Sequence, residues 1–343
     1  MKFRTIRGPL AIVAGVATVA GLAACSPADN ASQGDASGER TSVTIQIDGA
    51  AVPYYAPLYE AEEQGYFEEA GLDVEFTYAE ASSVLQNVAA GNVQFGFPNG
   101  DSVITAKANG VDVEVVHTTY QQGIGAVLFN KETNPIAKAE DLKGKTVAVT
   151  DLGSPNYIQL QAMLADAGMT VSELNVVTVG SGSIVAALQN GEVDAIVFSR
   201  LRYFALESAG FPVGQMLSDQ YLPSFGNVLV TSPALRESSP EVVAGFVSAL
   251  DKGIQYVIDN TEDAVTEVIA KYSDSFAGQE ESITQVITDV FVADLWQSDF
   301  TERHGFGYGD LDKWQAAIDA QVSFDLIDES YDASSLVVEP GDL

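Results

Sequence analysis

Two stretches of the chain repeat one pattern, and this repeat constrains the fold more than any other feature. The segments LQNVAAGNVQFGF (residues 85–97) and VAALQNGEVDAIVF (residues 185–198) both pass from a helix with one apolar face, through a glycine, into a buried strand. Gly91 and Gly191 stand at the helix ends, where the left-handed backbone of a C-cap favours glycine. The repeat predicts two α/β lobes of the same kind.

Strand-like runs alternate with helical runs through most of the chain. The strand-like runs cover residues 41–48, 73–78, 93–97, 111–117, 125–129, 146–150, 175–180 and 193–199. This alternation is typical of βαβ units on a mainly parallel sheet. We expect an α/β fold, in which the long amphipathic helices predicted after residue 240 pack back on the first lobe.

The chain is expected to cross between the lobes twice. A polar connector at residues 130–145 predicts the first crossing, and residues 221–226 predict the second. The first lobe is then discontinuous, with residues 42–129 and 226–330. The second lobe, with its crossover segments, takes residues 130–225.

The N-terminus predicts a lipoprotein signal peptide in residues 1–24. Three basic residues precede an apolar run, which ends at Leu22-Ala23-Ala24-Cys25. Small residues before a cysteine fit cleavage at that point, and the run is too short for a comfortable membrane span. Cys25, the only cysteine, is predicted to be lipidated. Residues 25–41, rich in small polar side chains, are expected to be a flexible tether on an extracytoplasmic, membrane-anchored protein.

Composition excludes several classes of function. The formal net charge is −32, whereas nucleic-acid binding needs a basic surface. With only two histidines and one cysteine, the chain has no cluster with the spacing of a transition-metal site. We expect neither a metal nor a cofactor. The 46% of hydrophobic residues can build two modest cores.

Ligands of open parallel sheets bind beyond the carboxyl ends of the strands. Two lobes that face each other would form one cleft from both sets of strand ends, which here carry aromatic rings and neutral polar groups. The predicted ligand-binding residues are Asp48, Tyr54, Tyr55, Asn99, Asp101, Tyr120, Ser154, Asn156, Tyr157, Ser199, Arg200, Phe225 and Asn227. This set has no paired base and nucleophile, so we expect no catalysis.

Several of these residues have an alternative structural role. Asp101 and Ser154 stand at predicted helix starts, where each could cap a helix instead of binding a ligand. Arg200 could pair with a surface carboxylate. The tyrosines could pack in the core, and His117, at another strand end, is more typical of a structural histidine.

Three segments in order resemble a known family. They are residues 47–75 (IDGAAVPYYAPLYEAEEQGYFEEAGLDVE), residues 141–149 (DLKGKTVAV) and residues 187–195 (ALQNGEVDA). Together they are similar to the solute-binding proteins of ABC importers in the NMT1/THI5-like group. The resemblance covers residues 42–323. It implies a two-lobed periplasmic-binding-protein fold of type II, which acts as a monomer and delivers a small molecule to a membrane permease with its ATPase subunits.

Within this group, residues 99–122 look most like the branch that binds vitamin precursors, such as the pyrimidine of thiamine or riboflavin-like compounds. That branch usually has an Asp-Trp pair after the first strand. Here Asp48 is kept, but Gly49 replaces the Trp, and Tyr55 stands where a His is common. The resemblance therefore implies a flat heteroaromatic ligand.

Three other functions remain open at this point, and one of them is a surface interaction or signalling module with the same fold. Receptors for alkanesulfonates, taurine or nitrate belong to the same group, but these anions need several donors and the predicted cleft has one arginine. The yeast pyrimidine synthase, an enzyme, also resembles this group. An enzyme of that kind would be cytosolic and need a lysine and a sacrificial histidine.

The signal peptide gives a first testable prediction. Cys25→Ala should leave the protein unprocessed or release it from its lipid anchor, because the acylated thiol is lost. Metabolic labelling with a fatty acid checks this. Equal labelling of wild type and variant would show that Cys25 is not the lipidation site.

Overall fold

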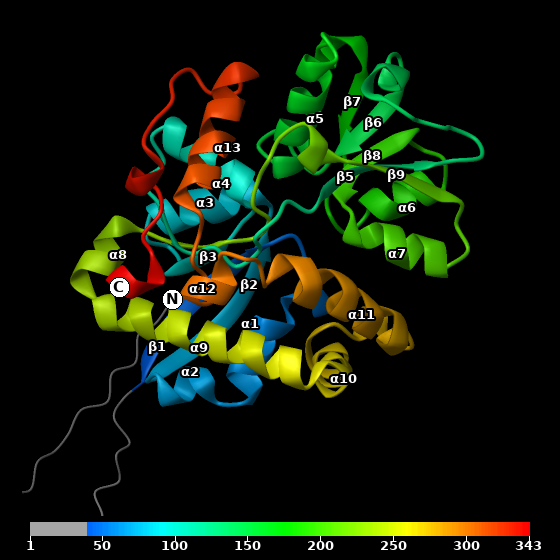
Figure 1. Cartoon of the computed structure of the whole chain (residues 1–343). Coiled ribbons are helices and arrows are strands. Elements are labelled where there is room, and N and C mark those ends of the chain that lie inside the picture. Colours follow the sequence, from blue (N-terminus) through cyan, green and yellow to red (C-terminus); the bar gives the residue numbers. More distant parts are fainter. Residues whose placement is uncertain (1–39) are drawn as a thin grey trace, which may run out of the picture. The chain divides into compact units, whose positions relative to one another are not determined.

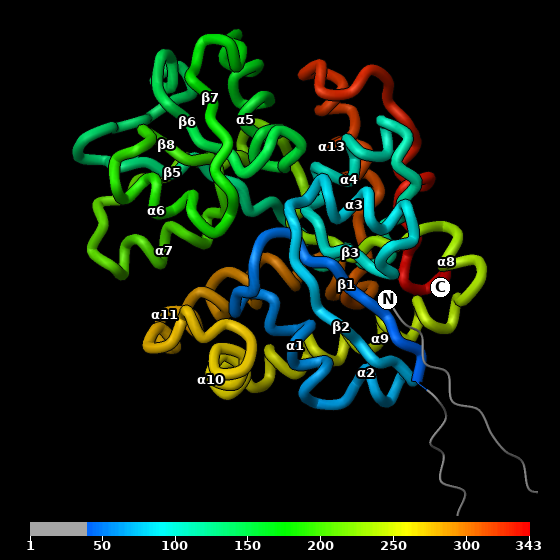
Figure 2. Tube along the Cα trace, turned by 180° about the vertical axis from the view of Figure 1, so that it is seen from behind, coloured from blue at the N-terminus to red at the C-terminus, as the bar shows by residue number. Residues whose placement is uncertain are grey.

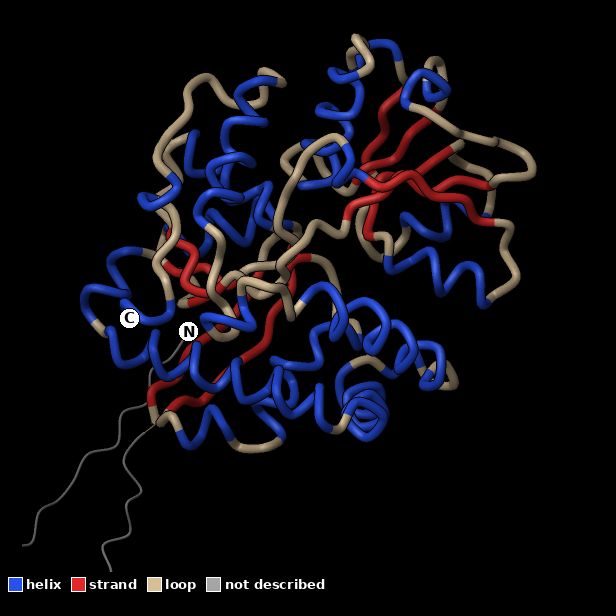
Figure 3. The backbone as a smooth tube through the Cα atoms, in the orientation of Figure 1, coloured by secondary structure: helices blue, strands red, loops and turns tan. Residues whose placement is uncertain are grey.

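The computed structural model describes residues 40–343. The signal peptide, Cys25 and nearly all of the tether lie outside the described residues. Within residues 40–343 no helix combines the length and the apolar composition needed to cross a bilayer. The strands of this part form two five-stranded sheets (Figure 3).

The two sheets have the same strand order. The first sheet contains β1 (Thr41–Asp48), β2 (Leu72–Ala79), β3 (Phe95–Phe97), β4 (Glu114–His117) and β10 (Leu229–Thr231), in the order β2-β1-β3-β10-β4. The second contains β5 (Gly125–Asn130), β6 (Thr146–Val149), β7 (Asn175–Thr178), β8 (Ala195–Ser199) and β9 (Val213–Leu217), in the order β7-β6-β8-β5-β9. In each sheet only the fourth strand of this order, β10 or β5, pairs antiparallel to its neighbours. The predicted α/β class with two lobes of one kind is confirmed.

Helices cover both faces of each sheet (Figure 1). The first lobe has α1 (Ala56–Glu63), α2 (Tyr66–Glu69), α3 (Ala81–Ala89), α4 (Gly100–Ala108), α8 (Pro233–Ser238), α9 (Pro240–Asp259), α10 (Thr261–Tyr272), α11 (Glu280–Val286), α12 (Thr301–His304) and α13 (Leu311–Ser323). A π-helix (Ile287–Leu295) continues α11. The second lobe has α5 (Pro155–Asp166), α6 (Ile184–Gln189) and α7 (Leu201–Ser208). Gly91 and Gly191 end α3 and α6 with φ of 72° and 69°, as predicted for C-caps.

The central strands, such as β3, β5 and β10, are buried on both faces, and successive residues supply different cores. In the second sheet, Val127 and Val197 face the core under α5, whereas Leu128 and Ile196 face the core under α6 and α7. The first sheet divides in the same way. One of its cores packs against α1, α9 and α10, and the other against α3, α4 and α13. The amphipathic helices after residue 240 therefore do pack on the first lobe.

The predicted position of the first crossing was wrong. Residues 125–130 form β5, which pairs with β8 and β9 of the second sheet, so the chain crosses between β4 and β5, in residues 118–124. A fully buried apolar strand can belong to either sheet, and its sequence pattern does not show which sheet it joins. The polar stretch at 130–145 is instead a loop of the second lobe. The second crossing leads from β9 to β10 and includes residues 221–226.

The crossing segments lie side by side, because the chain passes between the sheets in both directions at one place (Figure 2). The N–H of Gly226 donates to the carbonyl of Gln122 at 2.8 Å. The N–H of Tyr120 donates to the carbonyl of Asn227 at 3.0 Å. The C-terminal residues also join the first lobe, since the N–H of Val338 donates to the carbonyl of Val115 in β4. The first lobe thus extends beyond residue 330.

The packing of α9 on α1 gives a second prediction. A side chain at Gly253 would collide with the carbonyl oxygen of Pro57, so Gly253→Ala should lower the free energy of unfolding by about 1–3 kcal/mol. Gly245, on the same helix, has the methyl group of Ala70 3.3 Å from the corresponding Cβ position. Gly245→Ala should stay within about 1 kcal/mol of wild type, because alanine favours the helix. Chemical denaturation of both variants checks this, and equal stabilities would contradict it.

Candidate functional site

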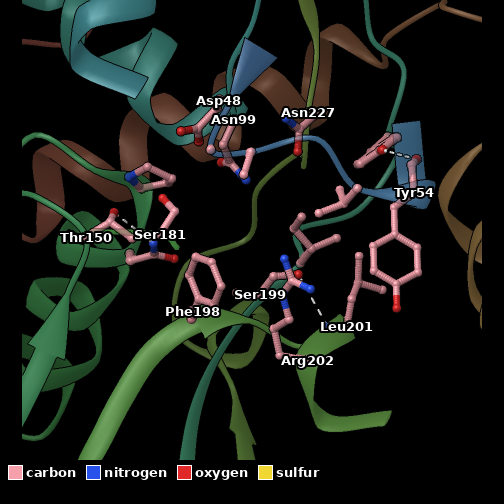
Figure 4. Close-up of a pocket in the computed structure, with 18 of the residues that line it drawn as sticks. Asp48, Tyr54, Asn99, Thr150, Ser181, Phe198, Ser199, Leu201, Arg202 and Asn227 are labelled. Atoms are coloured by element: carbon pink, nitrogen blue, oxygen red, sulfur yellow. Dashed lines mark hydrogen bonds between the residues drawn. The ribbon is translucent and has the colours of Figure 1, made fainter. Parts of the chain in front are cut away.

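A pocket lies between the carboxyl ends of the strands of the two sheets (Figure 4). About 790 Å³ of space between atoms lies within it, and this figure includes open solvent. Both lobes line it, with Asp48 at the end of β1 and Ser199 at the end of β8. The sheet ends therefore bring together residues that are far apart in the sequence.

Most of the predicted ligand-binding residues line this pocket. They are Asp48, Tyr54, Tyr55, Asn99, Tyr120, Asn156, Ser199 and Asn227. Alternation of strands and helices was enough to place them, because every one stands directly after a strand, at a helix start or in a crossing segment.

The tyrosine rings combine pocket lining with core packing. Tyr54 stacks on Phe291 with ring centroids 5.4 Å apart, and its carbonyl accepts a hydrogen bond from the Tyr120 hydroxyl at 3.0 Å. The Tyr55 hydroxyl donates to the carbonyl of Asp48 at 2.7 Å. These contacts hold the rings in place before any ligand arrives, which lowers the entropic cost of binding.

Five predicted residues do not line the pocket: Asp101, Ser154, Tyr157, Arg200 and Phe225. Ser154 is the N-cap of α5 and accepts a hydrogen bond from the backbone N–H of Tyr157 at 3.2 Å. Phe225 stacks on Trp314, with centroids 4.4 Å apart. Ser154 and Phe225 thus have structural roles. The predicted pairing of Arg200 with a carboxylate is not found among residues 40–343, where two nitrogens of its guanidinium are buried without a hydrogen-bond partner. Position after a strand could not distinguish the five residues, because it does not tell which way a side chain points.

Asp101 instead connects the two lobes behind the pocket. Its carboxyl accepts a hydrogen bond at 2.6 Å from the side chain of Gln159 in α5, and Gln159 itself lines the pocket. The cap of α4 is Asn99, whose side chain accepts from the backbone N–H of Asp101. Asp101 is completely buried, and this burial raises its pKa from 3.8 to about 8.

Several lining residues are not predicted from the sequence, above all Arg202 and Phe198. Arg202 stands in the first turn of α7, two positions after Arg200. Because α7 begins directly after β8, its first turn reaches the carboxyl end of the sheet. Thr150 and Ser181 were also missed, although each comes close after a strand of the second sheet.

The Asp48 end of the pocket is rich in carboxyl groups. Burial and, to a smaller extent, the nearby charges of Glu80 and Asp151 together raise the pKa of Asp48 from 3.8 to about 8. At neutral pH this carboxyl is therefore mostly protonated and can donate a hydrogen bond. Within residues 40–343 no cluster of three or more His, Cys, Asp or Glu side chains is arranged to hold a metal ion.

Two polar contacts join the lobes at the rim of this pocket. The Ser181 hydroxyl lies 3.0 Å from each carboxylate oxygen of Glu80, and the Ser82 hydroxyl lies 3.4 Å from a carboxylate oxygen of Asp151. With the Asp101 and Gln159 pair, the described residues thus connect the lobes both at the rim and behind the pocket.

A family model described as "NMT1/THI5 like" matches residues 52–264. The chain belongs to the NMT1/THI5-like family. Its two-lobed architecture also matches a solved Candida albicans protein described as having the generic periplasmic binding protein fold, with a TM-score of 0.66 at 17% identity over 87% of this chain and 96% of that one. The predicted fold family is confirmed.

Relatives within the family include binding proteins and enzymes. The riboflavin-binding protein RibY of Chloroflexus aurantiacus is 27% identical, over 79% of this chain and 78% of the relative. A formylaminopyrimidine-binding protein of Halalkalibacterium halodurans is 24% identical, over 81% and 83%. A 4-amino-5-hydroxymethyl-2-methylpyrimidine phosphate synthase of Aspergillus parasiticus is 24% identical, over 66% and 70%.

The buried Asp101 gives a third prediction. Because its pKa is higher in the folded protein than in the unfolded chain, folding favours the protonated form, and stability is lost as the pH rises from about 4 to about 8. Asp101→Asn should therefore reduce the fall in the free energy of unfolding across this window. Part of the fall in the free energy of unfolding should remain in this variant, because the pKa of Asp48 is also raised.

Denaturant titrations at several pH values measure this difference. Asp166→Asn, an exposed position at the end of α5, serves as the control and should keep the wild-type profile. An Asp101→Asn variant with the wild-type pH profile would contradict the proposed protonation.

Proposed function

We propose that this protein is the extracytoplasmic solute receptor of an ABC importer. It captures a small heteroaromatic nutrient, a thiamine-precursor pyrimidine or a riboflavin-like compound, and delivers it to a membrane permease and its ATPase. The observation that carries the proposal is the pocket lined by strand ends of both lobes. Such a pocket binds a ligand by closing the lobes and needs no reaction.

The chemistry of the lining supports a planar, polar-edged ligand. Tyr55 and Phe198 are partly exposed and line the pocket, and aromatic rings grip a flat ligand at low entropic cost. Neutral donors and acceptors surround them, namely Asn99, Thr150, Asn156, Gln159, Ser181, Ser199 and Asn227. A ligand that leaves such groups unpaired loses about 1–3 kcal/mol of binding free energy for each group, which makes the site selective.

The predicted lipid anchor at Cys25 completes this proposal. It would hold the receptor at the outer side of the cell membrane, beside its permease. The acidic surface, with a net charge of −32, is consistent with a small-molecule ligand and with no nucleic-acid partner.

An enzyme of the pyrimidine-synthase kind fits the pocket less well. A lysine is needed to hold an aldehyde, and among the described residues that line the pocket there is none. His117, one of two histidines in the chain, is buried and hydrogen-bonded to Thr119 and Asp251. It does not face the pocket.

Arg202 favours a second candidate function, a receptor for alkanesulfonates, taurine or nitrate. One guanidinium in the pocket could pair with a small anion. The many aromatic and amide groups around it would have no partner on such a ligand, so the heterocycle remains the main proposal.

Calorimetric titration gives a fourth prediction. Pyrimidines or flavin-like heterocycles should bind at micromolar or tighter dissociation constants, whereas taurine, alkanesulfonates and nitrate should not. Phe198→Ala should weaken binding by about tenfold, because it removes a stacking face. Tyr256→Ala, on α9 and outside the pocket, is the control. Tight binding of a sulfonate without binding of any heterocycle would overturn the proposed function.

Solution scattering tests the mechanism with the same ligand. Closure around the crossing segments should reduce the radius of gyration. An unchanged scattering curve at saturation would contradict closure of the lobes.

A further inference from the structure

Arg202 is a cation that faces the pocket without a counterion. It is partly buried, and the loss of water around it lowers its pKa from the usual value. Among residues 40–343, Arg202 forms no salt bridge with a carboxylate. None of its nitrogens is among the buried polar atoms without a hydrogen-bond partner, so the guanidinium remains accessible. A ligand that supplies an oxygen acceptor gains a charge-assisted hydrogen bond there.

Two aromatic rings, one from each lobe, lie close to this guanidinium. The Arg202 Cζ lies 5.7 Å from the ring centroid of Phe198 and 5.6 Å from that of Phe276. Phe276 belongs to the first lobe and Phe198 to the second, so both lobes hold the arginine. Since cation–π contacts use the faces of the rings, the N–H donors at the edge of the guanidinium remain available to a ligand.

The pocket therefore has two different ends. Asp48, Asn99 and Asn227 lie together on one side, whereas Arg202 and Phe198 lie on the opposite side in this view (Figure 4). The Asn side groups and the Asp48 carboxyl can each donate or accept. Arg202 can only donate, so the ligand edge that meets it must accept hydrogen bonds.

We infer that Arg202 selects the ligand, and that the pocket takes planar heterocycles which present carbonyl oxygens to this guanidinium. A pyrimidinedione edge, as in a flavin, has carbonyl acceptors with an N–H donor between them. An aminopyrimidine edge has amino N–H donors beside its ring nitrogen acceptors, so it offers the N–H donors of Arg202 fewer acceptors than the dione edge does. This inference rests on the proposed function and decides between its two ligand classes in favour of the flavin-like one.

Two pteridines of equal ring size test this preference. Pteridine-2,4-dione has carbonyl groups where pteridine-2,4-diamine has amino groups. Calorimetric titration of wild type should give binding of the dione at least about tenfold tighter than binding of the diamine. Arg202→Gln should weaken binding of the dione by about 10- to 100-fold and change binding of the diamine by less than about threefold.

Two further variants are needed, Arg202→Lys as an intermediate case and Arg303→Gln as the control. The lysine variant keeps the charge without the planar fork, so its affinity for the dione should lie between those of wild type and Arg202→Gln; it also serves if the glutamine variant does not fold. Arg303, exposed on α12, should be replaceable without effect on either ligand.

The outcomes separate the inference from the function beneath it. If wild type binds heterocycles but prefers the diamine, or if Arg202→Gln binds the dione as wild type does, the inference is wrong and the receptor function stands. If wild type binds none of the four compounds, namely the two pteridines, riboflavin and a thiamine-precursor pyrimidine, then the inference and the proposed receptor function both fail.

Discussion

The two crossing segments, packed backbone to backbone, are the constraint on which the rest of the structure depends. Direct hydrogen bonds between main-chain groups join residues 120–122 to residues 226–227, so the two connections form one narrow joint. Each sheet receives its only antiparallel strand, β5 or β10, directly from this joint. The carboxyl ends of the parallel strands are thereby aimed at one another, and the ligand pocket follows from this arrangement.

Electrostatics then divides the pocket. Burial keeps Asp48 protonated near neutral pH, while Arg202 remains a cation that only rings support. The rim contacts of Glu80 with Ser181 and of Asp151 with Ser82 are made between lobes, so they exist only where the lobes are closed together. In the proposed receptor, ligand contacts and these lobe contacts would stabilise the same closed arrangement.

The sequence predicted the fold better than the site. Repeated helix, glycine and strand patterns were enough for two similar lobes, because periodicity reports burial directly. They could not assign β5, whose residues are buried in any sheet. Position after a strand found Asp48 and Asn227, but it could not tell that Arg202 lines the pocket while Arg200 does not, since that depends on the start and rotation of α7. Cys25 lies outside the described residues, and its lipidation stays a prediction.

The central claim is that a planar heterocycle occupies the pocket between the lobes. The most direct measurement is mass spectrometry of the small molecules released when protein purified from its native cells is denatured. The account predicts an ultraviolet-absorbing heterocycle with carbonyl groups, present in wild type and depleted from Arg202→Gln. Release of an aliphatic sulfonate or taurine in its place, in amounts equal to the protein, would contradict it.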